Sequence, residues 1–195
     1  MMKRSGAEAL GIAGANPQLL VVTEDYLSAL ERLRLLDQEV DGERWGLRSQ
    51  PQRWSVSECV AHLNVTSRFF IPELERAVRE ARSLGVAPVR RYRRDPVGWL
   101  LYKIMPPPVR FRAKAPSRLV PEANVAKDES IREFEQLQEV QVGLLHQVEG
   151  LAIDRVKVPS PFNSRISYNL FAAFSILPLH QHRHLWQAEQ VWLHS

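Results

Sequence analysis

Residues 54–63 read WSVSECVAHL, and this stretch carries the clearest local signal for secondary structure in the chain. Ser55 and Glu58 fit the S-x-x-E capping box, in which each side chain accepts a hydrogen bond from a backbone N–H at the start of a helix. Trp54 stands immediately before the cap. Apolar residues then recur at helical spacing, namely Cys59, Val60, Leu63, Phe70, Leu74 and Val78. The sequence therefore predicts a long helix from residue 55, which Pro72 should kink or restart.

Three further stretches show helical periodicity, over residues 17–40, 128–149 and 167–192. The first begins at Asn16-Pro17, a side-chain cap followed by proline at the first helical position. The second ends near Gly150, a residue typical of helix C-termini, and the third contains Pro178, which predicts a kink. No stretch of comparable length shows the alternation of a half-buried strand. The predicted class is all-α.

The composition predicts one domain, over residues 16–195, preceded by a mobile tail over residues 1–15. The chain has 195 residues and 45% hydrophobic content, which suits a single hydrophobic core. No apolar run approaches the ~20 residues that a membrane-spanning helix needs, so we expect no membrane partner. Cys59 is the sole cysteine, which excludes an intramolecular disulfide and favours a cytoplasmic protein.

The positive charge is concentrated in one connection. The net charge is +4 with a pI near 9.5, but residues 84–121 hold nine basic residues against one acid, Asp95, giving +8 and leaving −4 for the rest. We interpret residues 84–125, which are rich in proline, as a crossover containing a short helix from Asp95-Pro96 to Ile104. Two readings of its charge remain, a solvated loop or an anion-attracting rim with Arg90–Arg94 as contacts. A nucleic-acid partner is disfavoured, because no recognition-helix motif is present.

The connection lengths predict how the four helices are arranged. About ten residues join the first two helices, which should be antiparallel, whereas the long crossover allows the third helix to lie parallel to the second. The result is a four-helix bundle with one long crossover between helices 2 and 3.

Three histidines are placed where such a bundle could use them together. His180 and His184 lie one helical turn apart in the string HQHRH, so that both can bind one ion, while His182 projects from nearly the opposite face. His62, in the second helix, is the candidate third ligand. Three neutral imidazoles and a water form the open arrangement of a catalytic metal. The alternative is a set of hydrogen-bonded core histidines, with Cys59 as a small core residue. His146 and His194 are expected at the surface.

These residues resemble a known family. Trp54-Ser55 opens a helix that carries His62, and the last helix contains HQHRHLWQ at residues 180–187. With these two features the chain is similar, over residues 17–193, to the DinB-like (YfiT-like) metal-dependent hydrolases. The resemblance implies an up-down-down-up four-helix bundle in which His62, His180 and His184 bind a divalent metal, zinc or nickel, and it implies a homodimer. The proline-rich crossover and Pro178 depart from the family pattern.

The predicted ligands are compatible with two reactions. A three-histidine metal can activate water for hydrolysis, and the resemblance also includes S-transferases that use low-molecular-weight thiols. The substrate is expected to be a small, anionic molecule. Glu58 is a candidate base, although its capping role explains it equally well, and Gln187 and Asn169 are candidate polar pocket groups. A non-catalytic metal-binding bundle remains the alternative.

Overall fold

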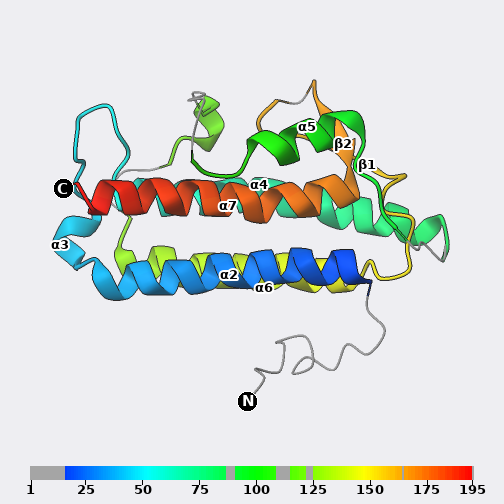
Figure 1. The fold of residues 1–195 in the computed structure, drawn as a ribbon, viewed down its shortest axis with the longest axis horizontal. Helices are drawn as coiled ribbons and strands as arrows, with labels where there is room; N and C mark the ends of the chain where they lie inside the picture. Colours follow the sequence, from blue (N-terminus) through cyan, green and yellow to red (C-terminus); the bar gives the residue numbers. More distant parts are fainter. Residues whose placement is uncertain (1–15, 87–90, 109–114, 122–124, 164, 195) are drawn as a thin grey trace, which may run out of the picture.

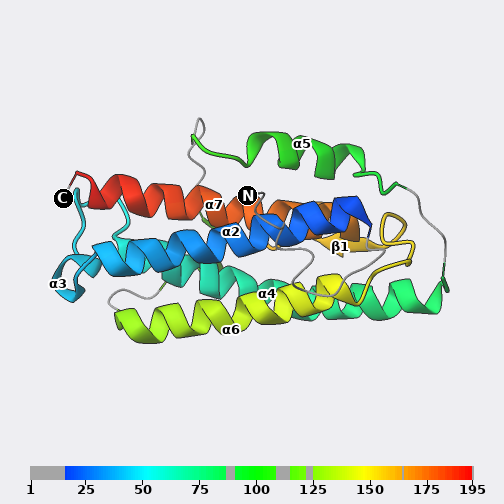
Figure 2. The same cartoon turned by 60° about the horizontal axis from the view of Figure 1, so that its bottom comes forward.

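The computed structural model describes residues 16–86, 91–108, 115–121, 125–163 and 165–194. Four long helices run side by side: α2 (Pro17–Glu39), α4 (Val56–Ser83), α6 (Lys127–His146) and α7 (Leu170–Trp192). In Figures 1 and 2, α2 and α7 run in one direction while α4 and α6 run in the other. The all-α, up-down-down-up bundle is confirmed. The predicted tail, residues 1–15, lies outside the described residues.

Two of the predicted helix starts, those of α4 and α2, are present as side-chain caps. The Ser55 hydroxyl accepts a hydrogen bond from the Glu58 N–H at 3.1 Å, and Glu58 Oε2 accepts one from the Ser55 N–H at 2.9 Å, completing the capping box of α4. Asn16 caps α2 by accepting from the Gln18 N–H at 2.9 Å. Pro72 does not restart α4, which continues as one helix to Ser83.

A short hairpin that the sequence did not predict precedes the last helix. Strands β1 (Lys157–Pro159) and β2 (Ser167–Asn169) pair antiparallel, with Val158 opposite Tyr168. Residues 167–169 are therefore strand rather than helix, because Asn169 is the cap of α7 and accepts from the Ala172 N–H at 2.9 Å. The helix predicted to end at Glu149 ends at His146. Strands of three residues are too short to give a periodic signal.

The crossover between α4 and α6 carries the predicted short helix, α5 (Pro96–Ile104), which lies along α7 (Figure 2). Asp95 caps it by accepting from the Gly98 N–H at 2.8 Å. Gly98 is buried against α7, where an added Cβ would lie only 2.3 Å from the Ala172 Cβ. A glycine is thus required for α5 to approach this closely. Two shorter elements, α3 (Gly42–Trp45) and the 3₁₀ turn η1 (Ser117–Leu119), flank the bundle.

The hydrophobic core consists of two clusters that follow one another along the bundle. One contains Phe70 of α4 and Leu177 of α7, and the other contains Leu63 of α4 and Leu185 of α7. On α7, His180 is buried between the two clusters, and on α4, His62 is buried beside Leu63 of the second cluster. Within the described ranges, every helix is too short or too polar to cross a bilayer.

Candidate metal centre

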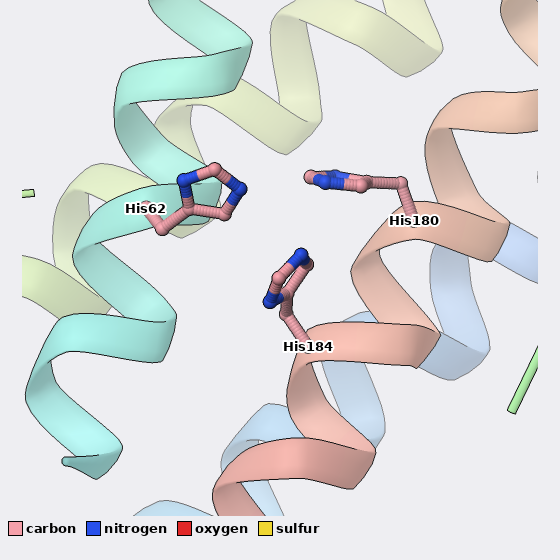
Figure 3. A group of neighbouring side chains, drawn as sticks. All are labelled: His62, His180 and His184. Carbon is pink, nitrogen blue, oxygen red and sulfur yellow. The ribbon is translucent and has the colours of Figure 1, made fainter. Parts of the chain in front are cut away.

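His62, His180 and His184 converge inside the bundle, as Figure 3 shows. His62 comes from α4, and the other two come from successive turns of α7. One ring nitrogen from each residue can be chosen so that all three lie within 4.8 Å of one another. The centroid of the His62 ring lies 5.3 Å from that of His180 and 4.5 Å from that of His184. The structure thus brings together the three residues that the sequence singled out.

Burial keeps these imidazoles neutral. The side chains of His62 and His180 are 2% and 4% exposed. Burial lowers the pKa of His62, although the Leu119 carbonyl acts in the opposite sense. The pKa of His180 is lowered well below its ordinary value, first by burial and then by His184, His62 and Arg183. The pKa of His184 is also lowered well below its ordinary value by burial, His62 and Arg183, although a hydrogen bond with Gln187 acts in the opposite sense. A neutral imidazole has the lone pair that a metal ligand needs.

The crossover orients one ring of the cluster. His62 Nδ1 lies 2.7 Å from the backbone carbonyl oxygen of Leu119 in η1. A carbonyl only accepts hydrogen bonds, so we assign the proton to Nδ1. Nε2 then carries the lone pair, and it points toward His180 and His184 in Figure 3. This arrangement, in which the second ring nitrogen donates to a carbonyl, is the usual support for a metal-binding histidine.

The donor set fits a transition-metal ion. Three neutral nitrogen donors suit zinc, nickel, iron and copper better than calcium or magnesium, which prefer oxygen. Nδ1 of His184 is buried and has no hydrogen-bond partner within the described part of the chain. An unsatisfied polar atom in the interior is costly, so the cluster has capacity for an ion or a water.

Two aromatic side chains flank the histidines. The Trp54 ring lies 4.8 Å from His62 and 5.8 Å from His184, and the Phe162 ring lies 5.0 Å from His180, measured between centroids. The sequence places Trp54 before a helix cap and within the family resemblance, but it does not predict the contacts of Trp54 with His62 and His184. Phe162 and Leu119 were not recognised, because both lie outside the bundle helices and no local pattern links them to His180 or His62.

Glu58, the candidate base, is engaged in local contacts. Arg48 Nε donates to Glu58 Oε2 at 2.8 Å, and Arg48 Nη2 contacts Oε1. Burial favours the neutral acid, but the hydrogen bonds from Arg48 and Ser55 outweigh it and lower the pKa of Glu58. Glu58 is not part of the three-histidine group. Its catalytic role stays a prediction, and these contacts favour the capping role.

The remaining candidates lie apart from the cluster or support it. Cys59 is fully buried among apolar side chains, and burial raises the pKa of its thiol. His182 projects away and contacts Ser28 Oγ at 3.0 Å, while His146 and His194 are exposed, as predicted. Asn169 caps α7 and donates to the Arg93 and Asp154 carbonyls. Gln187 lies beside His184.

Of the arginines expected at an anion-attracting rim, Arg94 and the backbone of Arg93 contact the N-terminal half of α7. Asn169 at the start of α7 holds the Arg93 carbonyl, and Arg94 Nη2 donates to Ser175 Oγ at 3.1 Å. The Arg94 guanidinium also stacks 3.7 Å from the centre of the Tyr102 ring. Arg90 lies outside the described residues. In the described chain, the cation whose charge acts on both His180 and His184 is instead Arg183.

Comparison with known proteins agrees with this architecture. The model of the DinB superfamily matches residues 18–188, nearly the whole bundle. No curated protein and no solved structure matches the chain. The match includes all three histidines, the whole of α4 and α6, α2 from Gln18 and α7 up to Ala188. The chain belongs to the DinB superfamily.

Proposed function

We propose that His62, His180 and His184 bind one divalent metal ion, zinc or nickel, and that the chain is a metal-dependent enzyme. The observation that carries this proposal is the convergence of three neutral ring nitrogens within 4.8 Å of one another in the interior of the bundle. A structural cluster of hydrogen-bonded core histidines is the less suitable explanation, because Nδ1 of His184 has no partner among the residues described.

The surrounding residues are suited to support such a site. A metal with three imidazole ligands and an open position supplies an activated water or a bound thiolate. The Leu119 carbonyl holds the proton on Nδ1 of His62 and thereby fixes the ring that faces the cluster. The aromatic rings of Trp54 and Phe162 lie beside His62 and His180 and supply apolar surface next to the site. The charge of Arg183 favours an anionic group nearby.

These features support either hydrolysis or thiol transfer on a small, anionic substrate. Both reactions need the same three ligands, and the positive charge of Arg183 favours either a carboxylate substrate or a low-molecular-weight thiol that carries carboxylates. Assaying the metal-loaded protein against esters and amides, and separately against electrophiles with added thiols, distinguishes the two. Hydrolysis proceeds without thiol, whereas S-transfer requires it.

Metal binding itself is tested by elemental analysis of protein purified without a metal-affinity tag. We expect about one equivalent of zinc or nickel in the wild-type protein and its loss in His62→Ala and His184→Ala. His182→Ala is the matched control, because this histidine comes from the same string but contacts Ser28 on α2. Undiminished metal in His62→Ala and His184→Ala contradicts the site.

A non-catalytic metal-binding bundle is the second candidate. The burial of His62 and His180 favours it, because both side chains are at most 4% exposed. A metal that binds only the folded state stabilises it by RT ln(1 + [L]/Kd), about 4 kcal/mol at a thousandfold excess over Kd. A structural metal therefore predicts a lower melting temperature on chelation and no turnover in either assay.

The homodimer and the cytoplasmic location stay proposals. The homodimer is carried over from the family resemblance, and analytical ultracentrifugation of the full chain tests it. The cytoplasmic location is supported by the single, buried Cys59. Fractionation of cells that express the full chain tests the location.

A further inference from the structure

Helix α5 presents an exposed apolar face on the outside of the bundle. Figure 2 shows α5 as an outer element. Among the described helices and strands, α7 and β2 are the two that make substantial contact with it. Four large apolar side chains on α5 are about half exposed, namely Val97 at 41%, Trp99 at 54%, Leu100 at 52% and Ile104 at 50%. Exposed apolar side chains are ordinary when scattered, but here they are concentrated in a nine-residue helix.

Helical geometry places these side chains on one side. Gly98 is buried, and Leu101, Tyr102 and Met105 pack on the hydrophobic core, so the side of α5 that carries them faces α7. Positions 97, 100 and 104 follow the i, i+3, i+7 spacing of a single face. Beyond Leu100, the same outer side of the helix continues with Lys103 and then Trp99. The outer side of α5 therefore combines an apolar surface with a tryptophan and a cation. We call Val97, Trp99, Leu100 and Ile104 the α5 face.

Basic side chains border the α5 face. Arg91 and Arg93, just before the helix, and Lys103, within it, are exposed. Among the ion pairs that the described residues form, none involves these three. Asp95, the only acid in residues 84–121, is paired with Lys157. Helix α5 and the residues just before it thus carry exposed cations as well as exposed apolar side chains.

We propose that the α5 face docks on an anionic lipid surface. A helix that lies flat at a membrane interface inserts aliphatic and tryptophan side chains among the acyl chains and headgroups while lysine and arginine contact anionic headgroups. Val97, Leu100 and Ile104 supply the aliphatic groups, Trp99 the interfacial aromatic, and Arg91, Arg93 and Lys103 the cations. The expectation that the chain has no membrane partner considered only spanning segments. Peripheral docking needs none.

A second copy of the chain fits this surface less well. Four half-exposed side chains offer roughly a few hundred Å² of apolar surface, whereas a stable dimer buries about 800 Å² on each partner. Two copies facing each other through α5 would also bring the same cations together. Double-stranded nucleic acid would attract the cations, but it offers no apolar region for Leu100 and Ile104.

Vesicle co-sedimentation of the full chain tests the proposal. The probes are vesicles of phosphatidylcholine alone and of phosphatidylcholine mixed with phosphatidylserine. We expect the wild type to bind the mixed vesicles only. The double variant Trp99→Ser with Leu100→Ser should bind them about tenfold more weakly or worse, and so should the triple variant Arg91→Gln, Arg93→Gln and Lys103→Gln. The matched control is Val21→Ser with Leu35→Ser on α2, where the side chains are equally exposed, at 53% and 54%. It should bind as the wild type does.

Two further measurements keep the result interpretable. Thermal unfolding must show that each variant is folded, which we expect because the substituted side chains are exposed. Tryptophan emission should shift to the blue when mixed vesicles are added to the wild type, and the shift should decrease in Trp99→Phe. Absent binding, equal binding to both vesicles, or unchanged binding by the α5 variants overturns the proposal. So does a dimer that dissociates in Trp99→Ser with Leu100→Ser, because the occupant is then a second copy.

Discussion

His62 Nδ1 lies 2.7 Å from the carbonyl oxygen of Leu119, a residue 57 positions further along the chain. This hydrogen bond connects the candidate metal centre to the crossover that separates α4 from α6. Leu119 is itself fully buried. The crossover is therefore not only a connection, because it determines which nitrogen of His62 faces His180 and His184.

Leu119→Ala should weaken metal binding without removing a ligand. Truncating a buried leucine costs about 2–5 kcal/mol, and the loosened η1 turn would no longer hold its carbonyl against Nδ1 of His62. Loss of such a supporting contact lowers metal affinity about 10–100-fold. Competition with a chromophoric chelator measures the affinity. Leu84→Ala, which truncates a leucine that is 57% exposed, is the control, and equal affinity in both variants contradicts the prediction.

The metal-free protein should lose stability as the pH falls through the range of the unfolded histidines. Burial lowers the pKa values of His180 and His184 well below the ordinary value of about 6.5. Below that pH the unfolded chain binds protons that the folded chain does not, so the free energy of unfolding decreases. The expected slope is about 1.4 kcal/mol per pH unit for each of the two histidines.

Urea unfolding of chelator-treated protein between about pH 7.5 and 5.5 measures this slope above the range in which carboxylates titrate. His180→Gln with His184→Gln removes both groups and should flatten the dependence. A slope that is the same in the double variant and the wild type shows that other groups are responsible.

Substitutions in the capping box should separate the two roles of Glu58. Ser55→Ala removes the hydroxyl that accepts from the Glu58 N–H and should cost about 1 kcal/mol of stability. Glu58→Gln keeps a side chain that can cap but removes the charge that Arg48 contacts. We expect both variants to retain metal, as checked by elemental analysis. A loss of about a hundredfold or more in turnover for Glu58→Gln alone would instead identify a general base.

Gly98→Ala should displace α5 from the bundle. The new Cβ would lie 2.3 Å from the Ala172 Cβ, and overpacking of this kind costs about 1–3 kcal/mol. Limited proteolysis should then cut near residues 99–104 faster than in the wild type. Adding Ala172→Gly removes the opposing methyl group, so the double variant should be more stable than the sum of the two single changes predicts. Strict additivity argues against a direct clash.

Local signals in the sequence determined the starts of α2 and α4. The capping box of Ser55 and Glu58 and the Asn16-Pro17 start are contacts within three residues, so they depend little on the rest of the fold. The periodicity of four long segments determined the bundle, and the lengths of the links predicted an antiparallel first pair and allowed the third helix to lie parallel to the second. The spacing of His180 and His184 on α7 follows from helical geometry alone.

The tertiary structure decided what surrounds those elements. His62 meets His184 only because α4 packs on α7, and Leu119 and Phe162 reach the cluster from loops whose paths no periodic pattern encodes. The hairpin of β1 and β2 is too short to be periodic, and α5 lies against α7 because Gly98 meets Ala172. A side chain a few residues away in a helix has a fixed position, whereas contacts between distant segments depend on the packing of the whole chain.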